Sequence, residues 1–151
     1  MTAVAAALLL TPLDERPLSA LLPVGDVAAI DFATLGLSAK ANQYLVCPAD
    51  LCAGQAHGAS PRFTHSVAQL RTRWNAVIAA QPRMVTLAEH DHQIDYVQRT
   101  ALFRFPDIIT VRFIPITPER STLALYSRSV YGSSDFGVNR ARLLHWLSAL
   151  N

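Results

Sequence analysis

The sequence has little charge and almost no lysine. Charged residues make up 16% of the 151 residues, Lys40 is the only lysine, and the formal net charge is only +2. Proteins that bind nucleic acid usually present a concentrated basic face, so this weak and dispersed charge argues against a nucleic-acid partner. The hydrophobic content of 51% excludes a disordered chain. No apolar run approaches the roughly 18–20 residues that span a bilayer, so we predict no transmembrane span.

The longest apolar run, Ala3–Leu10, ends at Thr11-Pro12 and has two interpretations. A complete signal peptide has a basic start and a longer apolar stretch, and this segment has neither. The run within residues 1–10 is therefore either the remnant of a trimmed leader or anchor, or an N-terminal helix or strand that lies on the core.

The chain contains only two cysteines, Cys47 and Cys52. A structural zinc site needs four ligands, and no histidine pair lies nearby at metal-ligand spacing, so we predict no metal. The spacing is not Cys-x-x-Cys, which argues against a thioredoxin-like redox site. The two residues form either a local disulfide, in an oxidising compartment, or two reduced and half-buried thiols. The glycine spacing of a phosphate loop or a dinucleotide fingerprint is also absent, and we predict no cofactor.

The length of the chain corresponds to one domain, and proline and glycine divide it into two zones. In the first zone these breakers recur so often that only short elements fit, and we predict an irregular N-terminal segment over residues 1–62. From residue 63 the hydrophobic pattern becomes regular, so we place the core of the domain at residues 63–151.

Two helices and four strands are predicted in this core. Apolar residues at helical spacing over residues 63–78 predict the first helix, with Ser66 and Gln69 as a capping box and Pro82 as its stop. The second helix is predicted over Asn139–Leu150, with Asn139 as its N-cap. The four strands are expected at Met84–Glu89, Gln93–Phe105, Ile108–Ile116 and Thr122–Tyr131.

Short links between successive strands form hairpins, so the four strands are expected to make an antiparallel meander. The predicted fold class is α+β, in the order α-β-β-β-β-α, with both helices packed on one face of the sheet. Alternation along the strands assigns side chains to the two faces. The face toward the helices receives Ile109, Val111, Phe113, Leu123 and Leu125. The opposite face is polar and carries Thr110, Arg112, Thr122, Tyr126 and Arg128, with Asp95 and Arg99 from the second strand.

Three segments of this core have a distinctive order of polar residues. They read DYVQRT from Asp95, RFPD from Arg104 and SRSVYGSSDFGVNRAR from Ser127, and the last is the most specific. Together they resemble a bacterial and plastid family, the domain of unknown function 1499. The resemblance begins near Asn42, although Asp50–Ala53 departs from the Pro-Asn-Cys-Val-Ser-Ser of many members. It implies the boundaries of the fold and an exported or membrane-anchored location, and it implies no activity, because the family has no established one.

The segment Ser127–Arg140 joins the last strand to the last helix and is the main candidate site. Its free N–H groups and the helix N-terminus suit an anion, with Arg128 and Arg140 converging on it. The structural alternative is that Asp135 pairs with an arginine and caps the turn, which fixes the helix against the sheet. The candidate ligand-binding residues are Arg99, Arg112, Arg128, Ser129, Ser134, Asp135, Asn139 and Arg140.

We predict a non-enzymatic binding or structural domain of the bacterial cell envelope or periplasm, with the cytoplasm as the alternative location. Its ligand would be an anionic small molecule or a partner protein, bound by the arginine-bearing sheet face and the 127–140 loop. The alternative function is a small hydrolase or transferase that uses Asp107 and Asp135 with Arg128 and Arg140. An enzyme needs a concave pocket lined by carboxylates, whereas a binding domain presents an arginine-rich face or an exposed apolar patch.

Overall fold

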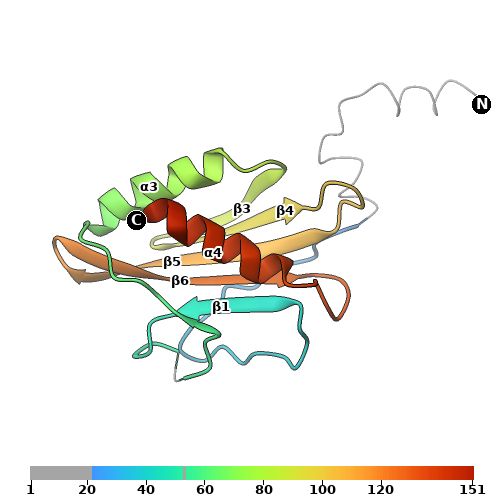
Figure 1. The fold of residues 1–151 in the computed structure, drawn as a ribbon, viewed down its shortest axis with the longest axis horizontal. Helices are drawn as coiled ribbons and strands as arrows, with labels where there is room; N and C mark the ends of the chain where they lie inside the picture. The colour runs from blue at the N-terminus through green and yellow to red at the C-terminus, as the bar shows by residue number, and fades with distance from the viewer. Residues whose placement is uncertain (1–21, 53) are drawn as a thin grey trace, which may run out of the picture.

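The computed structural model describes residues 22–52 and 54–151, so the apolar run within residues 1–10 lies outside the described residues. The described chain folds in the order β1, β2, α3, β3, β4, β5, β6, α4 (Figure 1). The strands are β1 Gln43–Cys47, β2 Gly58–Ala59, β3 Met84–His90, β4 Gln93–Arg99, β5 Pro106–Thr117 and β6 Arg120–Ser129. The helices are α3 Val67–Ala79 and α4 Val138–Leu150.

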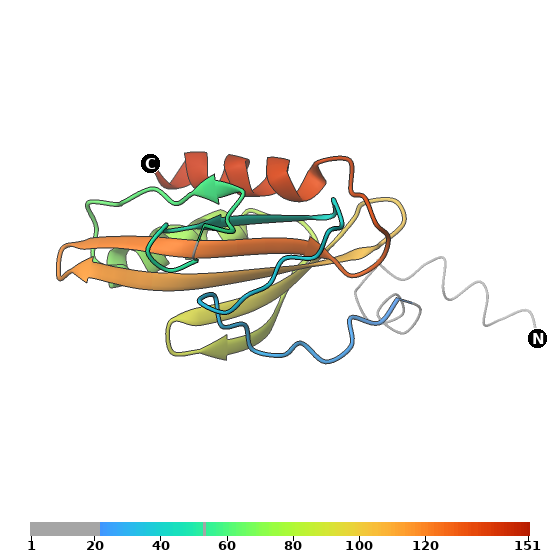
Figure 2. The same cartoon turned by 90° about the horizontal axis from the view of Figure 1, so that it is seen from below.

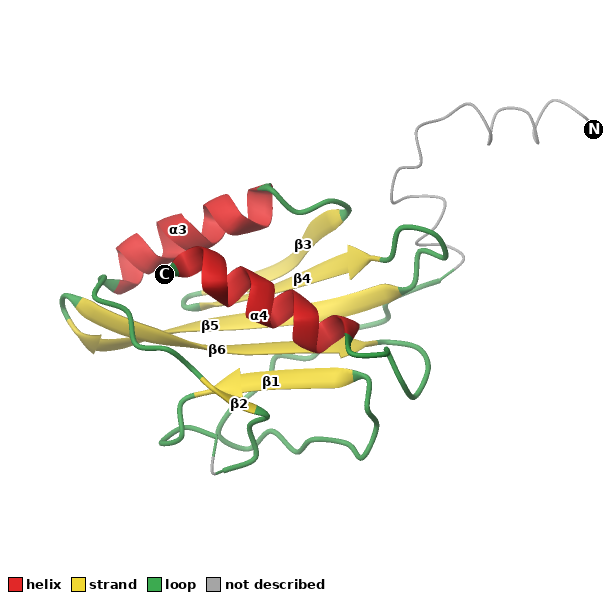
Figure 3. Ribbon diagram, in the orientation of Figure 1, coloured by secondary structure: helices red, strands yellow, loops and turns green. Residues whose placement is uncertain are grey.

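The strands form one sheet in the order β2-β1-β6-β5-β4-β3, and with the two helices this gives an α+β fold (Figure 3). The predicted antiparallel meander is present as β3 to β6, whose successive pairs are all antiparallel. The prediction of a four-stranded sheet was wrong, because β1 adds antiparallel to β6 and β2 adds in parallel to β1, which makes the sheet mixed. Both additional strands come from the segment that was predicted to be irregular. The β1–β6 pairing joins residues far apart in the sequence, which an argument from short links does not detect.

The turn between β4 and β5 is longer than predicted. β4 ends at Arg99, which pairs with Pro106 at the start of β5, so residues 100–105 form the turn and not the end of a strand. Thr100 closes this turn, because its backbone N–H donates to the carbonyl of Phe105 at 3.0 Å. The N–H of Phe105 in turn donates to the Thr100 hydroxyl oxygen at 3.0 Å. The apolar side chains of residues 100–105 are thereby held outside the sheet.

The two helices begin differently. In α3 the predicted capping box is confirmed: Ser66 Oγ accepts from the N–H of Gln69 at 3.2 Å, and Gln69 Oε1 accepts from the N–H of Ser66 at 3.0 Å. In α4 the N-cap position is Gly137. The prediction of Asn139 as N-cap was wrong, since Asn139 lies inside the helix and is buried. Among the described residues, neither helix has the length and apolar character that a membrane span requires.

Both helices pack on the same face of the sheet, as predicted (Figure 1). The core between them contains Trp74 of α3 and Trp146 of α4, which meet edge to face with ring centroids 5.8 Å apart. The indole N–H of Trp74 donates to the hydroxyl of Tyr96 on β4 at 3.0 Å. The buried polar groups of Trp74 and Tyr96 are therefore paired with each other. The residues predicted to face the helices are all buried in this core: Ile109, Val111, Phe113, Leu123 and Leu125.

The opposite face of the sheet is partly covered by residues 22–41, which run across it before the chain enters β1 (Figure 2). Phe32 of this segment is buried against Leu45 of β1 and Tyr126 of β6 in a second, smaller apolar cluster. The polar residues predicted for this face therefore share it with apolar ones. Two of them, Asp95 and Thr110, are buried and hydrogen-bonded to each other.

Candidate functional site

Residues 130–137 turn the chain from β6 into α4. Gly132 and Gly137 have φ angles of 85° and 82°, in the left-handed region that favours glycine. The carboxylate of Asp135 accepts hydrogen bonds from the backbone N–H groups of Gly137, at 2.9 Å, and Asn139, at 2.7 Å. The first N–H groups of a helix lack partners within the helix, and a negative charge there also interacts favourably with the helix dipole. Asp135 thus takes the capping role that the structural alternative assigned to it, but among the described residues no arginine pairs with it.

Asn139 is fully buried and connects α4 to β6 and to Asn42, the residue before β1. Its side-chain amide donates to the carbonyl of Asn42, at 3.1 Å, to Ser129 Oγ, at 3.0 Å, and to Asp135 Oδ2, at 2.6 Å. Its Oδ1 accepts from the hydroxyl of Ser127. An asparagine buried in this way must be satisfied at both its amide and its carbonyl group, and the surrounding strands provide those partners.

Arg142, one turn further along α4, completes this group of polar residues. Its guanidinium pairs with Asp107 on β5 at 2.6 Å, and the two side chains are only 9% and 4% exposed. The same guanidinium donates to Gln98 Oε1 at 2.7 Å, Ser127 Oγ at 2.9 Å and Asn139 Oδ1 at 2.7 Å. One side chain therefore joins α4 to three neighbouring strands. We call the following residues the Arg142 network: Asn42, Gln98, Asp107, Ser127, Ser129, Asp135, Asn139 and Arg142.

The sequence prediction missed Arg142 and gave its place to Arg140. The spacing contained the necessary signal, because Arg142 lies three residues after Asn139 and so shares its face of the helix. Arg140 lies on another side of α4, where its guanidinium is 5.9 Å from the centre of the Tyr44 ring. Position on the helix, and not charge alone, decides which arginine reaches Asp107 and Asn139.

Three other predicted arginines belong to the opposite face of the sheet. Arg99 is buried, and its guanidinium donates to the carbonyls of Leu22 and Arg104 at 3.0 and 3.1 Å. Arg128 lies 4.8 Å from the centre of the Tyr126 ring and donates to the Thr110 hydroxyl oxygen at 3.2 Å. Burial lowers the pKa of Arg128, because the charged guanidinium loses hydration. Arg112 is exposed.

The predicted site residues therefore fall into separate groups. Ser129, Asp135 and Asn139 come together in the Arg142 network, and Ser134 Oγ accepts from a neighbouring backbone N–H in the same loop. The four residues of the enzyme alternative do not converge. Asp107 lies on the helix-facing side of β5, whereas Arg128 of β6 lies on the opposite face of the sheet.

A cavity of about 450 Å³ lies between the β4–β5 turn and the β6–α4 loop. Both of these loops emerge at the same end of the sheet (Figure 1). We call this cavity the loop pocket. Asp107, Ser129 and Asp135 of the Arg142 network line it. Its other walls are mainly apolar, and Phe136 and Leu102 are 98% and 80% exposed to solvent. The apolar and aromatic lining residues are Leu102, Phe103, Phe105, Tyr131, Phe136 and Val138.

The fold and this site define a small α+β domain with a mixed sheet, two helices on one face, and an apolar pocket beside a buried polar network. The chain belongs to the family described as "Protein of unknown function (DUF1499)", whose family model matches residues 38–150. This match confirms the resemblance seen in the sequence and includes the whole Arg142 network and the lining of the loop pocket. No curated protein and no solved structure matches the chain.

Proposed function

We propose that this protein is a non-catalytic binding domain and that the loop pocket is its binding site. The observation that carries the proposal is the group of exposed apolar side chains on two adjacent loops, with Phe136 and Leu102 at its outer edge. Large apolar side chains that gather on a surface usually mark a place where another molecule binds, because their contact with water is unfavourable. The pocket volume of about 450 Å³ lies in the range of small-molecule sites.

The lining of the loop pocket favours a particular ligand chemistry. Its polar lining includes the carboxylates of Asp107 and Asp135 and the hydroxyl of Ser129. These groups attract a hydrogen-bond donor and disfavour a second negative charge. We therefore propose a small ligand with an apolar body and one uncharged hydroxyl or amino donor. The anionic ligand predicted from the sequence would fit this pocket poorly.

A catalytic role is less well supported by the same geometry. Asp135 already accepts two backbone N–H groups at the start of α4, and Asp107 is paired with Arg142. Neither carboxylate is paired with Arg128 or Arg140, the partners that a hydrolase or transferase mechanism was predicted to need. We accordingly favour the binding role.

The proposed location is the bacterial cell envelope. The structure joins Cys47 and Cys52 in a disulfide with their Cα atoms 6.1 Å apart, and structural disulfides persist mainly in oxidising compartments. Fractionation of the native cells, with an antibody against the protein, tests the location. Recovery in the cytoplasmic fraction with both thiols free would contradict it.

Binding of Nile red tests the ligand-binding role, because the fluorescence of this uncharged dye rises in apolar surroundings. We expect the wild-type protein to bind the dye and Phe136→Ser to weaken binding about tenfold, since burial of a phenylalanine contributes about 1.5–3 kcal/mol. Phe136 is 98% exposed, so its replacement should leave the fold intact. The matched control is Leu144→Ser on α4, an exposed apolar residue outside the pocket lining, and it should leave binding unchanged.

Two results would contradict the proposed function. One is equal weakening by both substitutions, which would indicate non-specific adsorption of the dye. The other is a pair of observations: the wild-type protein does not bind the dye, and it forms a dimer that the substitution Phe136→Ser dissociates. In that case, measured by sedimentation, the apolar loops would serve contact between two copies of the chain and not a small ligand.

A further inference from the structure

A second cavity, of about 760 Å³, lies toward the hairpin that joins β5 to β6, at the opposite end of these strands from the loop pocket. We call it the hairpin cavity. One wall is the loop of residues 48–51, a second is the segment of residues 59–62, and the third is formed by β5 and β6. Its apolar lining consists of Pro48, Ala49, Leu51, Ala59, Ile114, Pro115 and Ile116.

Arg62 and Arg112 also line the hairpin cavity, and both are exposed. Within residues 22–52 and 54–151, neither guanidinium makes a hydrogen bond, an ion pair or a ring contact. Arg128 and Arg142, by contrast, have protein partners. Two cations that line one cavity repel each other, whereas an anion bound between them would be attracted to both.

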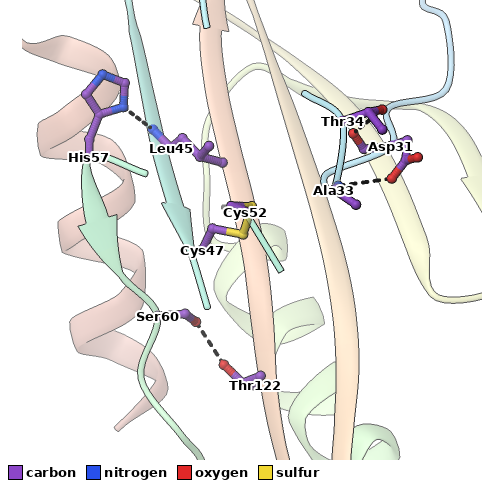
Figure 4. Close-up of a disulfide and its surroundings, with 9 residues drawn as sticks. All are labelled: Asp31, Ala33, Thr34, Leu45, Cys47, Cys52, His57, Ser60 and Thr122. Atoms are coloured by element: carbon purple, nitrogen blue, oxygen red, sulfur yellow. Dashed lines mark hydrogen bonds between the residues drawn. A yellow bond between two sulfur atoms is a disulfide. The ribbon is translucent and has the colours of Figure 1, made fainter. Parts of the chain in front are cut away.

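The hydroxyl groups of the hairpin cavity are already used within the protein. Thr122 Oγ1 donates to the carbonyl of Pro61 at 2.8 Å, and Ser60 Oγ lies 3.0 Å from Thr122 Oγ1, so these two hydroxyls bond to each other (Figure 4). The guanidinium groups of Arg62 and Arg112 are therefore the side-chain donors that remain for a ligand. Their planar arrangement of N–H groups suits the two oxygens of a carboxylate or a phosphate.

The disulfide gives this cavity a defined wall. Every residue between Cys47 and Cys52, from Pro48 to Leu51, lines the cavity, and Figure 4 shows the bond that closes this loop beside β1. A cross-linked loop has fewer conformations to lose when a ligand binds, so less of the binding free energy is spent on ordering it. The same loop contributes Asp50, whose carboxylate would oppose a bound anion.

We propose that the hairpin cavity binds an oxyanion, a carboxylate or phosphate, carried on a small apolar group. Arg62 and Arg112 bind the charged end, and the apolar lining contacts the remainder. The site is separate from the loop pocket, and it does not depend on the function proposed there. Arg62 is the more specific residue for testing this site. Arg112 also borders a smaller cavity near His90, whereas Arg62 lines only the hairpin cavity among the cavities described.

Titration of ¹⁵N-labelled protein with phenyl phosphate and with benzoate, followed by NMR, tests this site. Benzyl alcohol is the neutral control with the same ring, and it should bind much more weakly. We expect Arg62→Gln and Arg112→Gln each to weaken binding of the anions about tenfold, the loss typical of one charge-assisted hydrogen bond. Asp50→Asn should tighten binding about twofold, because it removes a nearby negative charge.

Arg140→Gln is the matched control, since Arg140 is an exposed arginine on α4 outside this cavity. It should leave the affinity for both anions unchanged. Because Arg62 and Arg112 are exposed, we expect both variants to fold, and the dispersion of the same spectra verifies the fold. The proposal is overturned if Arg62→Gln binds the anions as tightly as the wild type, if Arg140→Gln weakens them equally, or if benzyl alcohol binds equally well.

Discussion

Replacing Arg142 with methionine removes the guanidinium that Asp107 pairs with but keeps an unbranched side chain in the same space. The two side chains are 9% and 4% exposed, so the Asp107 carboxylate would be left inside the protein without its cation. Loss of one partner of a buried ion pair costs about 3–5 kcal/mol. Gln98 and Ser127 also lose the donor that contacts them. A domain of this size is stable by about 5–15 kcal/mol, so Arg142→Met should remove a large part of that stability.

Urea unfolding at neutral pH, followed by the fluorescence of the buried Trp74 and Trp146, measures this loss. Arg140→Met is the matched control on the same helix: its guanidinium is exposed over the Tyr44 ring, and such a contact contributes only about 0.5–1 kcal/mol.

A second variant separates the unpaired charge from lost packing. Asp107→Asn in the Arg142→Met protein replaces the isolated carboxylate with an uncharged amide, so it should restore part of the stability. The reasoning about the buried pair would be refuted if Arg142→Met cost no more than Arg140→Met. It would also be refuted if Asp107→Asn destabilised the Arg142→Met protein further.

Two further predictions concern stability. Replacing both Cys47 and Cys52 with alanine should lower the free energy of unfolding by about 2 kcal/mol, because the disulfide-closed loop restricts the unfolded chain. Urea unfolding measures this loss, and equal unfolding of the wild type and the double variant would contradict the prediction. Burial raises the pKa of Tyr96 and of Tyr126 above the ordinary 10.0, so the folded state retains these protons when the unfolded state loses them. The stability that these tyrosines contribute is fully present below pH 10.0 and is lost as the pH rises through the raised pKa values. Thermal unfolding measures the loss of stability, and tyrosinate absorbance measures the pKa values. Absorbance that titrates at the ordinary pKa in the folded protein would contradict the second prediction.

The elements with local signals could be predicted from the sequence. The α3 helix has a capping box within its first turn and an apolar stripe, and both depend on residues a few positions apart. The β3–β6 meander follows from short links, because a short link leaves two strands little choice but to pair antiparallel. The alternation in β5 and β6 then placed residues such as Phe113 and Leu125 toward the helices.

The rest of the fold and of the candidate site depends on contacts between distant parts of the chain. β1 pairs with β6 through residues such as Leu45 and Tyr126, and nothing near β1 in the sequence indicates that partner. Asp135, and not Asn139, caps α4 because the backbone of Gly137 takes a left-handed conformation that sequence spacing does not reveal. Alternation placed Arg99, Arg112 and Arg128 on the face away from the helices, but it does not show that the polar network around Asn139 forms on the other face.

The two cavities also differ in a way that makes their tests independent. The loop pocket contains carboxylates and exposed aromatic rings, whereas the hairpin cavity contains two arginines that have no side-chain partner among the residues that the structure describes. Each lies at its own end of β5 and β6, so Arg62→Gln should leave Nile red binding unchanged, and Phe136→Ser should leave phenyl phosphate binding unchanged. Both cavities lie within the matched residues 38–150. If one variant altered binding at both ends, the sheet between them would have to transmit the change, and the two ligands would then be linked through one domain and could not be treated as separate functions.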